Sequence, residues 1–81
     1  MAVELFEAWR RTGREVAVVG LGKSGAAATK LLRHEALPVY ASDTGTGTEF
    51  DTWAAALGAL GAEVQLGGHD LARITRASAV V

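Results

Sequence analysis

The 81-residue chain contains no cysteine and a single proline, and its positive and negative charges nearly cancel. The absence of cysteine excludes a disulfide framework, thiol catalysis and cysteine-based metal sites, and it fits a reducing compartment. A formal net charge of -1 provides no overall attraction to nucleic acid or to an anionic membrane. Any binding of phosphate must therefore come from local geometry.

Long hydrophobic runs are also missing. The opening segment, residues 1–11, carries Glu4, Glu7, Arg10 and Arg11, which is unlike a signal peptide or a membrane span. No later apolar run approaches the ~20 residues that a transmembrane helix needs. We therefore expect a cytoplasmic protein with no nucleic-acid partner and no membrane partner.

The size and composition indicate one small packed domain covering residues 1–81. The chain is 49% hydrophobic and has ten glycines, which fall between periodic segments rather than in a linker. A chain of this length is short for a complete multi-step enzyme. We expect a truncated single domain, because the last residues have the pattern of a strand that would leave an apolar sheet edge uncovered.

Hydrophobic periodicity predicts strands that alternate with helices. A short amphipathic helix around residues 5–9 ends near Gly13 and could cover one side of a sheet. The apolar residues of the next two helices suggest inner faces made of Ala27, Ala28, Leu31 and Leu32, and of Phe50, Trp53, Ala54 and Leu57. The predicted strands are 15–19, 39–43, 63–66 and 79–81, and the predicted helices after the first are 24–35, 50–60 and a weak turn at 70–75. This alternation predicts an α/β fold, a parallel sheet with helices on both faces.

The most informative motif is Gly20-Leu21-Gly22-Lys23-Ser24-Gly25, a G-x-G-x-x-G between a buried strand and a helix. Gly20 allows a tight exit from the strand, Gly22 lets the backbone approach a pyrophosphate, and Gly25 allows close packing of helix on sheet. The N–H groups at the start of the helix, with the helix dipole, stabilise an anion there. The motif therefore predicts a phosphate-binding loop.

Two alternatives apply to this loop. An ATP-binding P-loop would need glycine at position 17, which is Ala17 and lies inside the predicted strand, so ATP hydrolysis by this loop is disfavoured. Lys23 and Ser24 are candidates for phosphate contact, but a solvated lysine and a serine N-cap explain them equally well.

Further candidates follow the second and third strands. Asp43 comes 18 residues after Gly25, where dinucleotide folds place an acid that accepts a ribose hydroxyl and repels a 2′-phosphate. It could instead cap its own turn at Thr44-Gly45. Gly67-Gly68 would reach the same rim, or would form a turn that needs positive φ.

The remaining distinctive side chains suggest no further chemistry. His34 and His69 are isolated in the sequence, so we interpret them as surface or helix-end residues and expect no metal site. Trp9 and Trp53 fit within helical stripes and are interpreted as core residues. No pair of residues suggests acid-base or nucleophilic catalysis.

Together these motifs resemble the N-terminal domain of the Mur ligase family, which builds the peptidoglycan precursor. The resemblance rests on Val-Val-Gly-Leu-Gly-Lys-Ser-Gly, the Asp43-Thr44 pair and Gly67-Gly68-His69, and it covers roughly residues 15–81. It is strongest to the branch of the family that adds D-glutamate. The family often has a basic residue after the Asp-Thr pair, whereas this chain has Gly45, which puts a cationic contact from that position in doubt.

The resemblance implies a Rossmann-like domain that binds a UDP-linked muramoyl-L-alanine substrate. It places Gly20, Leu21, Gly22, Lys23, Ser24 and Gly25 at the diphosphate and uridine, Asp43 and Thr44 at the uracil, and Gly67 and Gly68 at the rim. It also implies ATP and Mg in central and C-terminal domains that have no counterpart here, so we expect this chain alone to be an inactive, monomeric part of a three-domain ligase. The alternatives are the nucleotide-binding half of an NAD-dependent oxidoreductase and a stand-alone nucleotide sensor.

Overall fold

A computed structural model describes the backbone of residues 2–81 and the side chains of residues 4–81, and Met1 of the expected opening segment lies outside them. Each predicted helix and strand is present, and the predicted bounds of the elements after the first helix are wrong by at most two residues. The elements in chain order are α1 (Ala2–Thr12), β1 (Val16–Val19), α2 (Lys23–His34), β2 (Val39–Asp43), α3 (Thr48–Ala59), β3 (Glu63–Leu66), α4 (Leu71–Arg76) and β4 (Ala79–Val80).

The four strands form one parallel sheet in the order β3-β2-β1-β4. The chain moves outward from β1 to β2 and β3, then crosses back so that β4 pairs with the other side of β1. Because all strands run the same way, their carboxyl ends meet at one edge of the sheet. The predicted α/β fold class is confirmed, and β1 is the strand at which the direction of winding reverses.

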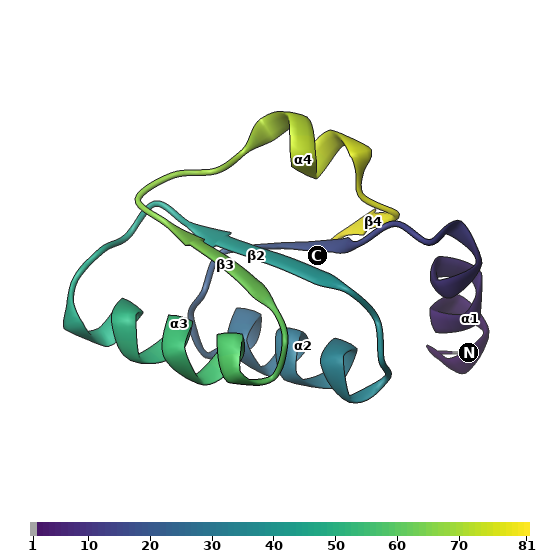
Figure 1. The fold of residues 1–81 in the computed structure, drawn as a ribbon, viewed down its shortest axis with the longest axis horizontal. Helices are drawn as coiled ribbons and strands as arrows, with labels where there is room; N and C mark the ends of the chain where they lie inside the picture. Colours follow the sequence, from purple (N-terminus) through teal and green to yellow (C-terminus); the bar gives the residue numbers. More distant parts are fainter. Residues whose placement is uncertain (1) are drawn as a thin grey trace.

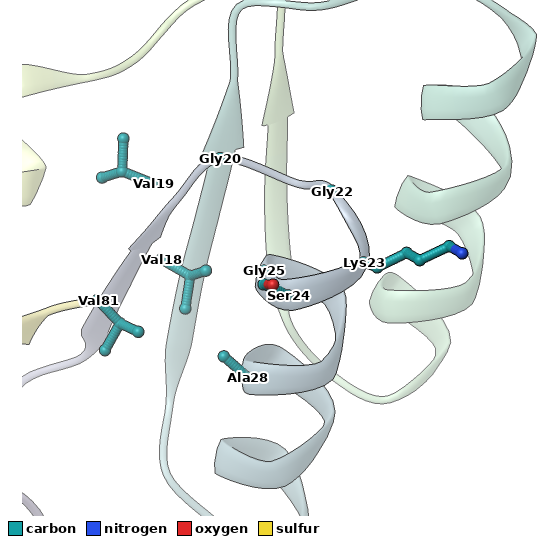
Figure 2. Close-up of a pocket in the computed structure, with 9 residues that line it drawn as sticks. All are labelled: Val18, Val19, Gly20, Gly22, Lys23, Ser24, Gly25, Ala28 and Val81. Atoms are coloured by element: carbon teal, nitrogen blue, oxygen red, sulfur yellow. The ribbon is translucent and has the colours of Figure 1, made fainter.

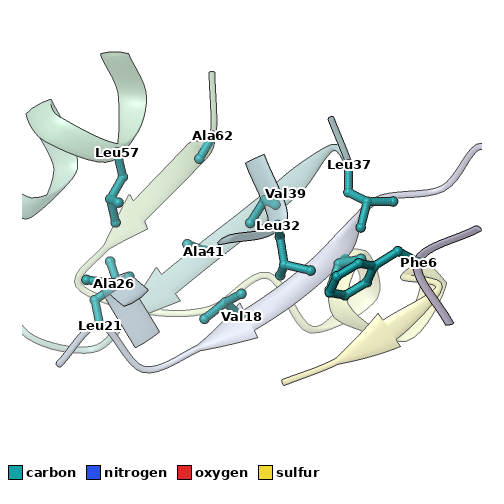
Figure 3. Packing of buried hydrophobic residues seen from close by; sticks show 11 residues of the cluster. Phe6, Val18, Leu21, Ala26, Leu32, Leu37, Val39, Ala41, Leu57 and Ala62 are labelled. Atoms are coloured by element: carbon teal, nitrogen blue, oxygen red, sulfur yellow. The ribbon is translucent and has the colours of Figure 1, made fainter. Parts of the chain in front are cut away.

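Helices cover both faces of this sheet, as predicted (Figure 1). The helices α2 and α3 lie side by side on one face, and the shorter α4 lies on the other. Side chains alternate between the two faces along each strand. Val18, Val39 and Ala41 pack with Leu32 and Leu57 in the main apolar cluster (Figure 3).

The inner face predicted for α2 is partly wrong. Ala26, Thr29 and Leu32 are buried, whereas Ala27 is exposed and Leu31 keeps 52% of its surface exposed. The polar Thr29 can occupy the core because its hydroxyl donates a hydrogen bond to the Gly25 carbonyl at 2.8 Å. The positions of the apolar residues alone therefore do not predict the buried stripe of α2 correctly.

The inner face predicted for α3 is confirmed. Leu57 is fully buried on α3, and Phe50, Trp53 and Ala54 are half-buried on the same helix. Trp9 and Trp53 both pack against the core cluster. None of the helices within residues 2–81 has the length and apolar character needed to cross a bilayer.

Candidate functional site

A hollow of about 370 Å³ lies at the carboxyl end of β1, between the start of α2 and Val81, the residue that follows β4. Ligands of open parallel sheets bind where the winding reverses, outside the carboxyl ends of the strands. The hollow is at that place, and Figure 2 shows the glycine loop along its margin. Its lining consists of Val18, Val19, Gly20, Gly22, Lys23, Ser24, Gly25, Ala28 and Val81.

The first and last glycines of the loop have the structural roles predicted for them. Gly20 adopts a φ of 101°, and its N–H donates to the Ser42 carbonyl at 2.7 Å. A Cβ on Gly25 would lie 1.8 Å from the Gly20 carbonyl oxygen, so no side chain fits there. The α2 helix can therefore start directly against the end of β1.

The start of α2 presents free backbone donors. Gly22 is the N-cap residue, with a φ of -84°, and no side chain caps the helix. Within residues 2–81, the N–H groups of residues 22–25 have no hydrogen-bond acceptor. A Cβ on Gly22 would meet no atom within 4 Å, so space is open above these donors. An anion could bind there through the backbone alone.

The interpretation of Ser24 as an N-cap is wrong, because the helix starts earlier than predicted. Gly22 takes the N-cap position, so Ser24 lies within the first turn, exposed at the hollow. Lys23 is also exposed, and Figure 2 shows its side chain extending away from Gly25 and Val18. Both side chains remain candidates for phosphate contact.

Asp43, at the end of β2, joins the glycine loop to the next turn. Its Oδ2 accepts from the Leu21 N–H and its Oδ1 accepts from the Gly45 N–H, each at 2.7 Å. The bond from Leu21, followed by that from Gly45, lowers the pKa of the carboxyl group. The alternative that Asp43 caps its own turn is thus confirmed. Its lone pairs beyond these two bonds remain free to accept from a ligand.

The Gly67-Gly68 turn reaches the same rim, as predicted. The Gly68 N–H donates to the Asp43 carbonyl at 3.1 Å, and the Gly67 N–H donates to the Gly45 carbonyl at 3.2 Å. Both glycines have positive φ, of 78° and 158°, as the alternative of a glycine-requiring turn predicted. The glycine loop, Asp43 with the exposed Thr44, and this turn are therefore brought together; whether they bind a ligand stays a prediction.

His69 and Ser42 form a pair that the sequence patterns did not indicate. The Oγ of Ser42 lies 2.6 Å from Nδ1 of His69, and His69 is half-buried rather than an isolated surface residue. Although a serine beside a histidine can be a catalytic pair, Ser42 is 0% exposed and cannot reach a substrate. One signal in the sequence could have indicated this pair: Ser42 lies near the end of β2, and His69 follows soon after the end of β3, the neighbouring strand. The interpretation of His34 is confirmed, since it is exposed at the end of α2.

A second hollow, of about 290 Å³, lies at the amino ends of the strands and is lined by Arg14, Glu15, Arg73 and Arg76. Arg73 forms a short ion pair with Glu15 and another, at 3.0 Å, with Glu63. The hydrogen bonds that Arg73 donates to Glu15 and then to Glu63 raise the pKa of its guanidinium group. Arg73 also lies over the Tyr40 ring, 4.5 Å from its centroid. Within residues 2–81, no three potential metal ligands come together.

Comparison with known proteins identifies one curated relative of part of this chain. Over 50 residues, 62% of this chain, it is 46% identical to the UDP-N-acetylmuramoylalanine--D-glutamate ligase of Synechococcus sp. (strain CC9902). The matched segment spans 11% of that ligase's length. No family model and no solved structure matches. The similarity supports a relationship to the Mur ligases over part of the chain.

Proposed function

We propose that this chain is the UDP-sugar-binding domain of a ligase that adds D-glutamate to UDP-N-acetylmuramoyl-L-alanine. The single observation that carries the proposal is the uncapped start of α2, where residues 22–25 line the hollow at the winding reversal and their N–H groups have no acceptor within residues 2–81. The curated relative supports the identity of the ligand, because its name includes UDP-N-acetylmuramoylalanine.

In this proposal the ligand crosses the carboxyl edge of the sheet. The diphosphate binds Gly20, Leu21, Gly22, Lys23, Ser24 and Gly25, while the sugar extends into the hollow beside Val81. The uracil lies toward β2 and β3, near Asp43 and Thr44, with Gly67 and Gly68 at the rim. Because the free donors belong to the backbone, the domain can bind a diphosphate without an excess of positive charge.

Position 45 differs from the family pattern in a way that the packing explains. A Cβ on Gly45 would lie 2.5 Å from the ring of Phe50, so Phe50 occupies the space that a side chain there would need. We therefore assign no cationic contact to this position. In the proposed ligase, ATP and Mg bind other domains; in this chain Ala17 departs from the P-loop pattern.

The competing function is the nucleotide-binding half of an NAD-dependent oxidoreductase. The glycines and Asp43 fit it equally well, but the curated relative does not favour it. Calorimetric titration of the chain with UDP and with NAD separates the two functions. We expect UDP to bind more tightly, and preferential binding of NAD would overturn the proposal.

The variant Gly22→Val tests whether the loop is the phosphate site. The wild-type φ of -84° is open to any residue, and a Cβ meets no atom within 4 Å, so the variant should fold. Its side chain would occupy the space above the free N–H groups and should abolish UDP binding. Ala27→Val, at an exposed position of the same helix, is the matched control and should bind UDP as the wild type does. Unchanged affinity in a folded Gly22→Val variant would assign the loop a purely structural role.

A further inference from the structure

We propose that His69 is a positioning residue of this site, which holds the Gly67-Gly68 turn against the end of β2 through the buried hydroxyl of Ser42. The inference rests on the proposed function, since it concerns the rim that faces the nucleoside end of the ligand. It assigns a role to a histidine that the sequence alone indicated to be an isolated surface or helix-end residue.

The hydrogen bond between these side chains has a direction that burial determines. Ser42 is 0% exposed, so its hydroxyl proton needs an acceptor inside the protein. Within residues 4–81, Nδ1 of His69 is the recorded partner, at 2.6 Å. Ser42 therefore donates, Nδ1 accepts, and the neutral imidazole carries its proton on Nε2.

The turn depends on residues outside itself, because Gly67 and Gly68 have no side chains. One backbone bond to Gly45 and one to Asp43 hold it on the β2 side. Immediately after His69, the Asp70 N–H donates to the Tyr40 hydroxyl at 2.9 Å, and that hydroxyl donates to Gln65 Oε1 at 2.6 Å. His69 supplies the side-chain anchor between these two attachments.

The end of β2 and the two residues after it hold the glycine loop and the Gly67-Gly68 turn together. Residues 42–45 accept from Gly20 and Leu21 of the glycine loop, and from Gly67 and Gly68 of the turn. The Ser42 to His69 bond adds a side-chain link to this set. Loss of His69 should therefore displace the turn without disturbing the glycine loop, whose bonds to Ser42 and Asp43 do not involve the imidazole.

Two substitutions at position 69 separate positioning from simple packing. His69→Leu removes the acceptor, whereas His69→Asn places an amide oxygen close to the position of Nδ1, so that variant can still accept from Ser42. The matched control is His34→Leu, at an exposed position at the end of α2. Each variant is titrated with UDP, which spans the proposed rim, and with pyrophosphate, which contacts the glycine loop alone.

We expect His69→Leu to weaken UDP binding about fivefold to tenfold, the effect typical of losing one buried hydrogen bond. Pyrophosphate affinity should not change, and both His69→Asn and His34→Leu should bind UDP nearly as the wild type does. Equal weakening for UDP and pyrophosphate, or no weakening in a folded His69→Leu variant, overturns the inference.

A ligand-free measurement tests the anchor directly. Nitrogen-15 NMR of the wild-type imidazole in its neutral form should show the proton on Nε2 and not on Nδ1, and amide exchange at Gly68 should be faster in His69→Leu than in the wild type. A proton on Nδ1 in the neutral ring, or unchanged exchange in the folded variant, overturns the inference. If the wild type does not bind UDP, the proposed function fails, and this second measurement alone decides whether His69 anchors the turn.

Discussion

The two hollows at opposite ends of the sheet differ in how their polar groups are satisfied. At the amino ends, Arg73 is paired with Glu15 and Glu63 and lies over Tyr40. At the carboxyl ends, the N–H groups at the start of α2 have no recorded acceptor within residues 2–81, and the margin consists largely of glycine. The hollow with more charged residues is thus the one in which carboxylates of the same chain already compensate the charge of Arg73.

This difference indicates that charge content alone is a poor guide to a binding site. An ion pair that is complete within the fold gains little from a ligand, because the ligand would have to replace partners already in place. Unbonded backbone donors lose only water when an anion binds. Three substitutions test the contrast between the structural end and the proposed binding end.

The largest expected effect is at Gly25, where the loop itself is packed. In Gly25→Ala the new Cβ would lie 1.8 Å from the Gly20 carbonyl oxygen, and backbone atoms cannot move aside cheaply. We expect the free energy of unfolding to fall by about 3 kcal/mol in urea denaturation, with loss of UDP binding. The control Gly58→Ala adds a Cβ to α3 in open space and should raise stability by roughly 0.5 to 1 kcal/mol. Similar stabilities for the two variants would contradict the close packing.

An intermediate effect is expected at Arg73, the centre of the structural end. Its side chain is 27% exposed, so Arg73→Met leaves Glu15 partly buried without its partner. We expect a loss of about 2 kcal/mol in the free energy of unfolding, with UDP affinity unchanged. Arg76→Met, at an exposed position of the same helix, should change stability by less than about 0.5 kcal/mol. A loss of UDP binding in folded Arg73→Met would mean that this end also takes part in binding.

The smallest stability effect is expected at Asp43, and it should depend on pH. The N–H groups of Leu21 and Gly45 hold the pKa of Asp43 below its ordinary value of 3.8 in the folded state. The carboxylate therefore stabilises the fold above about pH 3.8, and this contribution is lost as pH falls through the lower folded-state pKa.

Urea denaturation of Asp43→Asn measures that contribution. We expect the variant to be about 1 kcal/mol less stable than the wild type at pH 6, and the difference to shrink as the pH falls toward about 2.5. Glu7→Gln, at an exposed position of α1, is the control and should show no comparable pH-dependent difference. A difference that stays constant with pH would show that the two bonds do not depend on the charge of Asp43.

Local patterns predicted most of the fold and the three segments of the site. The apolar run of β1 and the glycines after it act within a few residues, so their effect is readable from the sequence. The order of the strands was not readable, because the side of β1 that β4 pairs with depends on packing over the whole chain. The hollow beside Val81 was missed for that reason. The pairing of Ser42 with His69 depends on the register between β2 and β3, and the burial of Thr29 depends on a carbonyl one helical turn away.

The hollow at the glycine loop is bordered by Val81, which directly follows the short strand β4. β4 pairs with β1 at two positions, and Val81 adds one bond to Ala17, at 2.8 Å, and one from Val19, at 3.0 Å. Such an edge separates from its neighbour at a lower free energy than the central strands do. A ligand that contacts Val81 would bind while this edge is paired with β1. Part of its binding free energy would therefore go into keeping the edge closed. Saturating the hollow should then slow amide exchange at Val81 more than at Val18, so that this peripheral strand reports occupancy.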